Sequence, residues 1–155
     1  MARTTRRTVI AAAVLVAGLT GCSVANPITT QIPYAPSDGI RVSVTNGVSV
    51  ENLMILTEGE GEPAHLLGAV ANNSTEPISI TFALGDSGQP IPVRAGSGDT
   101  VNFTGAGIST ATGEGAPGST LPATVSADGV GDIEVEVPVL DGTLPPYDEY
   151  LEDAA

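Results

Sequence analysis

The sequence has no lysine and no tryptophan, and it has only one histidine and one cysteine in 155 residues. Five arginines are its basic residues, and three of them, Arg3, Arg6 and Arg7, come before every acidic residue. Binding to nucleic-acid phosphates needs clustered lysine or arginine, so we exclude a nucleic-acid partner. A single cysteine forms no disulfide within the chain. With only two phenylalanines, a folded core has to be built from aliphatic side chains.

The first 21 residues have the pattern of a signal peptide. The three N-terminal arginines are followed by an uninterrupted run of 11 apolar or small residues, Val9–Leu19. A membrane-spanning helix needs about 20 such residues to cross about 30 Å of hydrocarbon, whereas the shorter run suits a signal peptide. The pair Arg6-Arg7 is also compatible with twin-arginine export, and the residues do not separate that route from general secretion.

Leu19-Thr20-Gly21-Cys22 ends this segment and matches the bacterial lipobox. Small residues before the cut let the backbone enter a peptidase in extended form, and the Cys22 thiol is the nucleophile that receives a diacylglyceryl group. We expect cleavage between Gly21 and Cys22 and lipid on Cys22. Each buried methylene contributes about 0.8 kcal/mol, so two or three acyl chains such as palmitate would hold the chain on the outer face of the cell membrane.

Cleavage at this position leaves a strongly acidic chain. Residues 22–155 contain two basic residues, Arg41 and Arg94, and all 18 acidic residues, which gives a formal charge of −16. Such a charge keeps a domain soluble and away from anionic lipid headgroups. We therefore expect the chain to contact the membrane through the lipid on Cys22.

Composition divides the remaining chain into three parts. Residues 22–38 contain three prolines and no hydrophobic periodicity, which predicts a flexible tether after the lipidated cysteine. Residues 39–140 carry strand patterns and have the length of one domain. Residues 141–155 carry five acidic residues and two adjacent prolines, which predicts an acidic, loosely ordered tail.

Alternation of apolar and polar residues predicts an all-β domain. Asn46-Gly47 lies between two alternating runs, and this is the strongest short-range sign of a β-hairpin because both positions tolerate positive φ. No helical periodicity follows the signal peptide. The expected strands are Ile40–Thr45, Val48–Glu51 with the unbroken apolar run Leu53–Leu56 after it, His65–Ala71, Ile78–Leu84, Ile91–Arg94, Thr100–Thr104, Leu121–Val125 and Ile133–Val139.

These strands are short and are separated by turn residues, with 19 glycines and 12 prolines in the chain. Seven or eight such strands in about 100 residues are typical of a β-sandwich. The sequence therefore predicts an immunoglobulin-like antiparallel β-sandwich of about seven strands. A β-barrel is the alternative fold.

The lipobox, the strand sequence of His65–Ser74 and the segment Val137–Gly142 followed by Pro146-Tyr147 resemble small surface lipoproteins of actinobacteria, including the mycobacterial Lpq-type proteins. That family is similar to periplasmic copper chaperones with a cupredoxin-like sandwich. The resemblance implies copper handling as an alternative function, because copper chaperones of that kind bind copper(I) through histidine and several methionines. Apart from its first residue, this chain has one methionine, Met54, and one histidine, His65.

Two groups of residues are candidates for a metal site. Met54 and His65 could face each other across a hairpin, and a thioether with an imidazole suits copper(I). Two ligands are too few for a strong site, so we interpret Met54 as a core residue and His65 as a rim residue. Glu58, Glu60 and Glu62 lack the spacing of a calcium loop and are interpreted as a solvated hairpin tip. The sequence thus predicts no metal or cofactor.

Catalytic patterns are missing as well. No G-x-S-x-G sequence is present, and Gly96-Ser97-Gly98 is interpreted as a loop. Glu134 and Glu136 alternate with apolar residues on one strand and are expected to be solvated. Gly105–Pro122 is expected to be a surface loop, and the tail tyrosines, Tyr147 and Tyr150, either dock a partner or fold back on the domain.

These observations leave two classes of function. The first is a non-enzymatic binding or interaction module of the cell envelope that recognises an envelope protein or wall polymer. The second is copper handling, which the resemblance implies. The first is the prediction from the residues themselves, because the side chains that the second requires are few.

Overall fold

The computed structural model describes residues 37–85, 89–108, 115–145 and 147–154. The predicted signal peptide, Cys22 and most of the predicted tether lie outside these residues. The chain divides into two units, Met1–Pro33 and Tyr34–Ala155, and all described residues belong to the second. Within the described part, no helix is long and apolar enough to cross a membrane.

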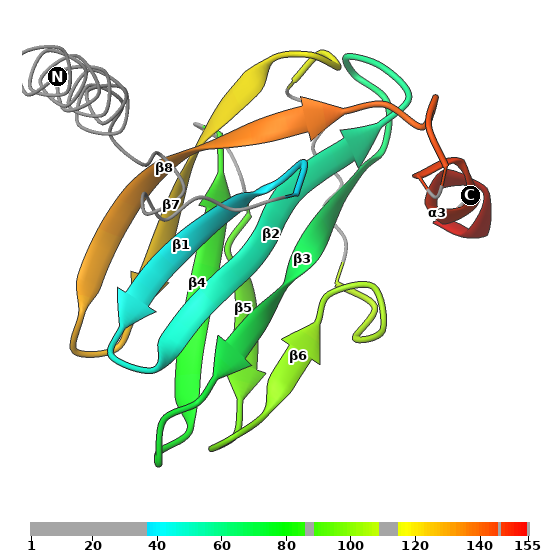
Figure 1. The fold of residues 1–155 in the computed structure, drawn as a ribbon. Coiled ribbons are helices and arrows are strands. Elements are labelled where there is room, and N and C mark those ends of the chain that lie inside the picture. The colour runs from blue at the N-terminus through cyan, green and yellow to red at the C-terminus, as the bar shows by residue number, and fades with distance from the viewer. Residues whose placement is uncertain (1–36, 86–88, 109–114, 146, 155) are drawn as a thin grey trace, which may run out of the picture. The chain divides into compact units, whose positions relative to one another are not determined.

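The described residues form eight strands and one C-terminal helix (Figure 1). Hydrogen bonds join the strands in the order β5-β4-β7-β8-β2-β3-β6, and β1 pairs with β2 beside this path. The elements are β1 (Ile40–Thr45), β2 (Val48–Thr57), β3 (Ala64–Asn72), β4 (Ile78–Leu84), β5 (Ile91–Ala95), β6 (Thr100–Asn102), β7 (Thr120–Ala127), β8 (Gly131–Leu140) and α3 (Tyr147–Ala154).

One parallel pairing makes the sheet mixed. Ile55 and Leu56 of β2 pair in parallel with Val139 and Leu140 of β8, while every other pairing is antiparallel. This position is available because β1 covers β2 only as far as Leu53. The predicted immunoglobulin-like antiparallel sandwich is therefore wrong in its strand directions. The strands form one mixed sheet that curls into a near-barrel (Figure 1). This arrangement is closer to the β-barrel that the sequence left as the alternative fold.

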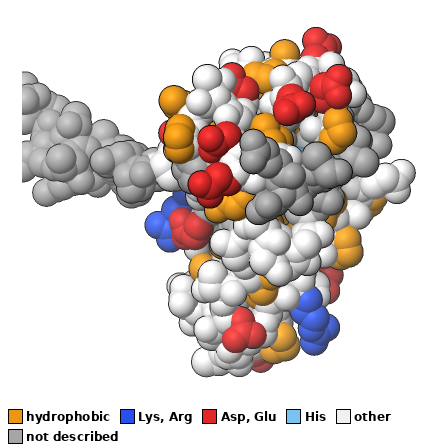
Figure 2. All heavy atoms as spheres, turned by 90° about the vertical axis from the view of Figure 1, so that its right-hand side faces the viewer, with side chains coloured by type: hydrophobic (Ala, Val, Ile, Leu, Met, Phe, Trp, Pro, Cys, Tyr) orange, Lys and Arg blue, Asp and Glu red, His pale blue; other side chains and the backbone are white. Residues whose placement is uncertain are grey.

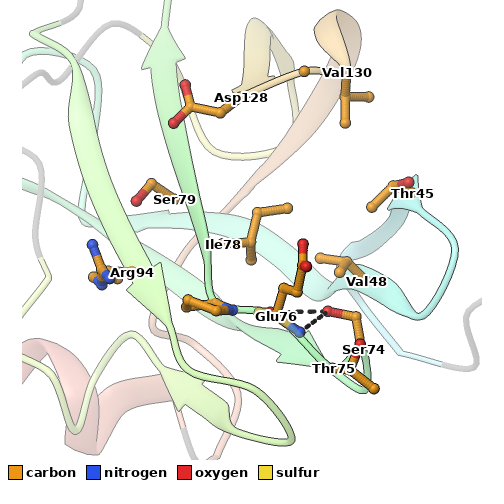
Figure 3. Close-up of a pocket in the computed structure, with 12 residues that line it drawn as sticks. Thr45, Val48, Ser74, Thr75, Glu76, Ile78, Ser79, Arg94, Asp128 and Val130 are labelled. Carbon is orange, nitrogen blue, oxygen red and sulfur yellow. Dashed lines mark hydrogen bonds between the residues drawn. The ribbon is translucent and has the colours of Figure 1, made fainter.

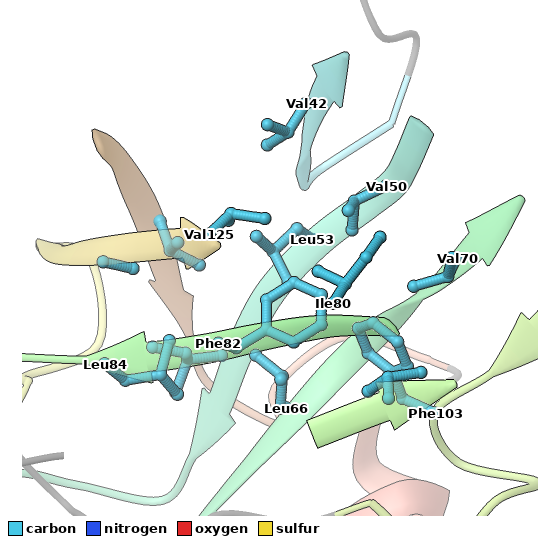
Figure 4. Packing of buried hydrophobic residues seen from close by; sticks show 14 of the residues in the cluster. Val42, Val50, Leu53, Leu66, Val70, Ile80, Phe82, Leu84, Phe103 and Val125 are labelled. Carbon is cyan, nitrogen blue, oxygen red and sulfur yellow. The ribbon is translucent and has the colours of Figure 1, made fainter. Parts of the chain in front are cut away.

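The core is aliphatic around one pair of aromatic rings (Figure 4). Ile80, Phe82 and Leu84 of β4 are buried on one face, as their alternation predicts. Phe82 packs edge-to-face on Phe103, with ring centroids 5.3 Å apart and an interplanar angle of 71°. Such a pair contributes about 0.5–1.5 kcal/mol beyond its buried area. Because Phe103 directly follows β6, the pair joins the two end regions of the sheet across the interior.

The last strand has the two faces that its sequence predicts. Val137 and Val139 are buried in the core, and Ile133 and Val135 pack against it. The carboxylate side chains between them, Glu134 and Glu136, are exposed.

Strand β2 contains a bulge that changes which of its side chains face the core. Asn52 has a φ of 53° and is the one described non-glycine residue with positive φ, and the pairing with β3 shifts between Glu51 and Met54. Before the bulge the even-numbered apolar residues face the main core, and after it Leu53 and Ile55 do. Met54 therefore lies on the outer face, in a second, smaller apolar cluster.

Gly68 of β3 lies opposite this bulge and allows it to form. Its φ is 134°, and a Cβ atom there would lie 3.0 Å from the carbonyl oxygens of both Glu51 and Asn52. The Gly68 carbonyl accepts a hydrogen bond from the Phe103 N–H at 3.0 Å. The Asn52 side chain accepts another from the Gly39 N–H at 2.9 Å. The bulge is thus packed against backbone on one side and hydrogen-bonded on the other.

Asn72, at the end of β3, joins two strands that do not pair in the sheet. The side chain is fully buried, and its Nδ2 donates to the carbonyl oxygens of Glu76 at 2.8 Å, Ala95 at 3.3 Å and Gly96 at 2.8 Å. Its Oδ1 accepts hydrogen bonds from the Ser74 N–H at 3.0 Å and the Ser74 hydroxyl at 2.6 Å. The amide therefore connects β3 with the end of β5 and with the loop before β4.

The predicted hairpin at Asn46-Gly47 is confirmed, since Thr45 pairs with Val48. Of the two turn residues, Gly47 has positive φ (78°) and Asn46 does not. The turn is therefore not of the type in which both central residues have positive φ.

Helix α3 occupies most of the tail that we expected to be loosely ordered. Asp148 and Glu149 lie in its first turn, where negative charge interacts favourably with the helix dipole. Tyr147 and Leu151 pack against the outer apolar cluster of the sheet. The helix has eight residues, which is too short for stability in isolation, so its formation depends on this packing.

The bulge predicts unequal effects of two alanine substitutions at glycines with positive φ. Gly68→Ala should lower the free energy of unfolding by about 3 kcal/mol, because strained backbone and close contacts add together. Gly107→Ala should lower it by about 1 kcal/mol, because Gly107 has a φ of 66° but no atom within 4 Å of the added Cβ. Urea unfolding of both variants measures the difference, and equal losses would show that the bulge does not require Gly68.

Candidate functional site

The residues to which the sequence gives the clearest role lie outside the described residues. These are Gly21 and Cys22, at the expected cleavage and lipidation site. Their assignment stays a prediction, and the functional site of the folded domain has to be sought elsewhere.

A polar pocket of about 490 Å³ lies at one end of the near-barrel (Figure 3). Four separate parts of the chain line it. The β1–β2 turn contributes Thr45 and Val48, the loop before β4 and the start of β4 contribute residues 74–79, and β5 contributes Arg94. The β7–β8 turn contributes residues 128–130. The sequence gives no motif for this pocket, because its parts are up to 85 residues apart.

The loop that forms one wall of the pocket is held by hydrogen bonds. The Ser74 hydroxyl donates to the Glu76 carbonyl at 3.0 Å, and the Glu76 N–H donates back to it at 3.4 Å (Figure 3). The Ser97 hydroxyl donates to the Ser74 carbonyl at 2.9 Å. Together with the buried Asn72 amide, these bonds fix the loop against β3 and β5. The Gly96-Ser97-Gly98 segment is thus part of a structural turn, in agreement with its interpretation as a loop.

The two described arginines have different surroundings. Arg41 lies 3.0 Å from the Glu51 carboxylate, and this is the one ion pair among the described residues. Arg94 lines the pocket, where Glu76 and Asp128 are the acidic lining residues. All three of these charged residues are exposed. The pocket therefore presents charges of both signs that are available to a ligand.

Apolar side chains complete the pocket. Val130 is 41% exposed in the β7–β8 turn, and Ile78 is half-buried at the start of β4. Figure 3 shows Val130 and Thr45 on the side of the pocket away from Arg94. Val130 and Ile78 provide apolar contact area beside the charged groups of the pocket.

Met54 and His65 share the outer face of β2 and β3. Met54 pairs with Leu67 and His65 pairs with Leu56, so the two candidates are diagonal neighbours, which are typically about 7–8 Å apart. Met54 is 2% exposed, and His65 is half-buried. The strand register thus places the two residues on one face without pairing them directly, and Met54 packs with other apolar residues as a core methionine does.

The C-terminal helix covers this outer face. Tyr147 and Leu151 pack against the cluster of Met54, Leu56 and Leu67. The Tyr147 hydroxyl donates a hydrogen bond of 2.5 Å to the Asp38 carboxylate. This contact raises the pKa of Tyr147 to about 12. The tail therefore folds back on the domain, which is one of the two expectations for its tyrosines.

The acidic loop between β2 and β3 is a solvated tip. Glu58, Glu60 and Glu62 are exposed, and Thr57 braces the loop through hydrogen bonds from its hydroxyl to the carbonyls of Gly59 and Pro63, both 3.0 Å. In the part of the chain that the structure describes, no three histidine, cysteine or acidic side chains are placed to hold a metal ion. Figure 2 shows acidic side chains over the upper part of one face, with apolar side chains between them.

The sequence matches no protein-family model and no curated protein. Similar solved structures include the apo PCuAC domain from PmoF1, at 16% identity and a TM-score of 0.46, covering 64% of this chain and 97% of that domain. The copper-bound PCuAC domain from PmoF2 has 15% identity and a TM-score of 0.47, covering 65% and 97%. The apo PmoF2 domain has 14% identity and a TM-score of 0.48, covering 67% and 97%.

The domain is distantly similar to PCuAC domains. At this level the similarity extends to the general arrangement of strands and not to a ligand. The resemblance to actinobacterial surface lipoproteins stays a prediction from the sequence.

The hydrogen bond between Tyr147 and Asp38 predicts a pH dependence of stability. A phenol whose pKa is raised in the folded state contributes its full stability below the unfolded value of 10.0 and loses it as the pH rises to about 12. Ionisation removes the donated proton and places a negative charge beside Asp38. We expect the urea midpoint to fall more between pH 10 and pH 12 in the wild-type chain than in Tyr147→Phe.

Tyr150→Phe is the matched control for this comparison, because it removes a neighbouring phenol from the same helix. That variant should keep the pH dependence of the wild type. An identical decrease in the wild type and in Tyr147→Phe would show that this hydrogen bond does not hold the helix.

Proposed function

We propose that this chain is a lipid-anchored, non-enzymatic binding protein of the cell envelope, held at the membrane through Cys22 and binding an envelope protein or wall polymer. The pocket between the β1–β2 turn, the loop before β4 and the β7–β8 turn is the observation that supports binding most directly. Turns and loops that are distant in the sequence meet there on a rigid β framework, and binding sites are commonly built in this way. The lipobox supports the anchor.

The pocket and the start of the folded domain lie at opposite ends of β1. The predicted tether leads into Ile40, the first residue of this strand, while Thr45, its last residue, lines the pocket. Six extended residues at about 3.3 Å each span roughly 20 Å. The pocket therefore opens at the end of the domain away from the entry of the tether, where another molecule of the envelope can reach it.

Site-specific photocrosslinking in intact bacterial cells tests this proposal. A photoreactive amino acid replaces Val130 at the rim of the pocket in the full chain. As a matched control, the same amino acid replaces Leu144, which is 67% exposed and lies just before α3. We expect a discrete adduct with an envelope component from position 130 and not from position 144.

Identical adducts from both positions, or none from position 130, would argue against a binding role for this end of the domain. An adduct from position 144 alone would indicate that the binding surface lies near α3 instead. In either case the predicted anchor would be unaffected, because it is tested by separate measurements.

Copper(I) handling is the second candidate, and the shared face of Met54 and His65 is the observation that favours it. A thioether and an imidazole are suitable ligands for copper(I). Met54 is 2% exposed and packs against Tyr147 and Leu151, so little of its thioether is accessible to a copper ion. The pocket, by contrast, is open, and we therefore rank binding at the pocket first.

A titration of the full chain with copper(I) separates the two candidates. We expect no sub-micromolar binding, because two ligands, one of them buried, are too few. Sub-micromolar binding that Met54→Leu abolishes and His65→Gln weakens would make copper handling the better proposal. Leu67→Met is a useful comparison, since it adds a second thioether to the same face without removing the first.

A further inference from the structure

The charges in the pocket are arranged in a way that points to the ligand. Arg94 lies on β5 and is the cross-strand partner of Ser79 on β4. Glu76 and Asp128 belong to two other parts of the wall. Figure 3 shows Arg94 on one side of the pocket and Asp128 on another, with the Glu76 carboxylate directed into the space between the walls. No ion pair joins Arg94 to an acidic residue within the described part of the chain.

We infer that this pocket recognises a short peptide through its free carboxylate and its free ammonium group. This inference goes beyond the proposed function, because a free short peptide is neither an envelope protein nor a wall polymer, and it adds a second class of ligand for the same pocket. The guanidinium group of an arginine matches a carboxylate with two parallel hydrogen bonds. Arg94 is one of two basic residues after the lipobox, and the other, Arg41, is already paired with Glu51.

The acidic side chains supply the second half of the recognition. Glu76 and Asp128 line other parts of the pocket wall than Arg94 and are suited to hold an ammonium group. An anion without a positive charge would meet two carboxylates for one guanidinium group, which disfavours it. A zwitterionic ligand meets an opposite charge at each end, so the arrangement selects for both groups together.

The size and the apolar part of the pocket agree with a short peptide. A volume of about 490 Å³ lies within the range of about 300–1,000 Å³ that is usual for small-ligand sites. The exposed Val130 and the half-buried Ile78 offer contact to small apolar side chains. The loop that carries Glu76 is already fixed through the Asn72 amide, so little order has to be gained on binding.

An NMR titration of the full chain in detergent micelles tests the inference. The probes are alanyl-alanine, N-acetyl-alanyl-alanine, which lacks the ammonium group, and alanyl-alanine amide, which lacks the carboxylate. We expect alanyl-alanine to shift the methyl signals of Val130 in a saturable way. Each blocked peptide should bind at least about tenfold more weakly, which is the loss expected for one charge-assisted hydrogen bond.

Two variants and one control assign the effect to the pocket. Arg94→Gln should weaken alanyl-alanine about tenfold and should bind the amide as well as the free acid. Asp128→Asn should reduce the preference for the free ammonium group. Arg41→Gln, which removes the arginine that pairs with Glu51 and does not line the pocket, should change nothing.

Equal binding of the three peptides, unchanged binding by Arg94→Gln or the absence of any shift at Val130 would each overturn the inference. These outcomes are distinct from failure of the proposed function. A photocrosslinked partner at position 130 without peptide binding would keep the binding role and reject the peptide as its ligand.

Discussion

The buried amide of Asn72 is the interaction on which both the fold and the pocket depend. Its nitrogen donates to carbonyls of the loop before β4 and of the end of β5, and its oxygen accepts from Ser74. A buried polar group without partners costs about 1–3 kcal/mol, so the amide and the loop are stable only together. The same bonds tie β3 to β5, which do not pair in the sheet. One residue thus fixes a strand junction and a wall of the binding site.

The bulge at Asn52 has a comparable role further along the same pair of strands, β2 and β3. It turns Leu53 and Ile55 toward the main core and Met54 outward, where α3 covers it. Because both faces of this part of β2 are buried, its sequence is a continuous apolar run. Such a run does not show which residue faces which side, and the helix that buries the outer face is itself stabilised by that contact.

Strands with one solvated face could be predicted from the sequence. Alternation in Ile78–Leu84 and Ile133–Val139 placed their core residues correctly, since a period of two marks a half-buried strand. The parallel pairing of β2 with β8 could not be predicted, because it joins segments about 80 residues apart and depends on how far β1 extends along β2. Helix α3 was missed because its eight residues, four of them acidic, form a helix only through packing on the cluster of Met54, Leu56 and Leu67.

The candidate site was less predictable than the fold. The placement of Met54 and His65 on one hairpin could be predicted because they lie on consecutive strands. The pocket could not, because its walls come from turns that meet only in the folded domain. One signal was present in the sequence: Arg94 is one of two basic residues in a chain with 18 acidic ones. A rare charge of this kind is a reason to look for a ligand near it.

The proposed role of the pocket depends on attachment of the chain to a membrane through Cys22. Intact-mass analysis of the chain extracted from the membranes of bacterial cells tests it most directly. We expect a chain that begins at Cys22, without the preceding 21 residues, and that carries at least two acyl chains on this cysteine. A membrane fraction in which the chain still contains residues 1–21, or in which the Cys22 thiol is unmodified, would show that the protein is not a lipoprotein.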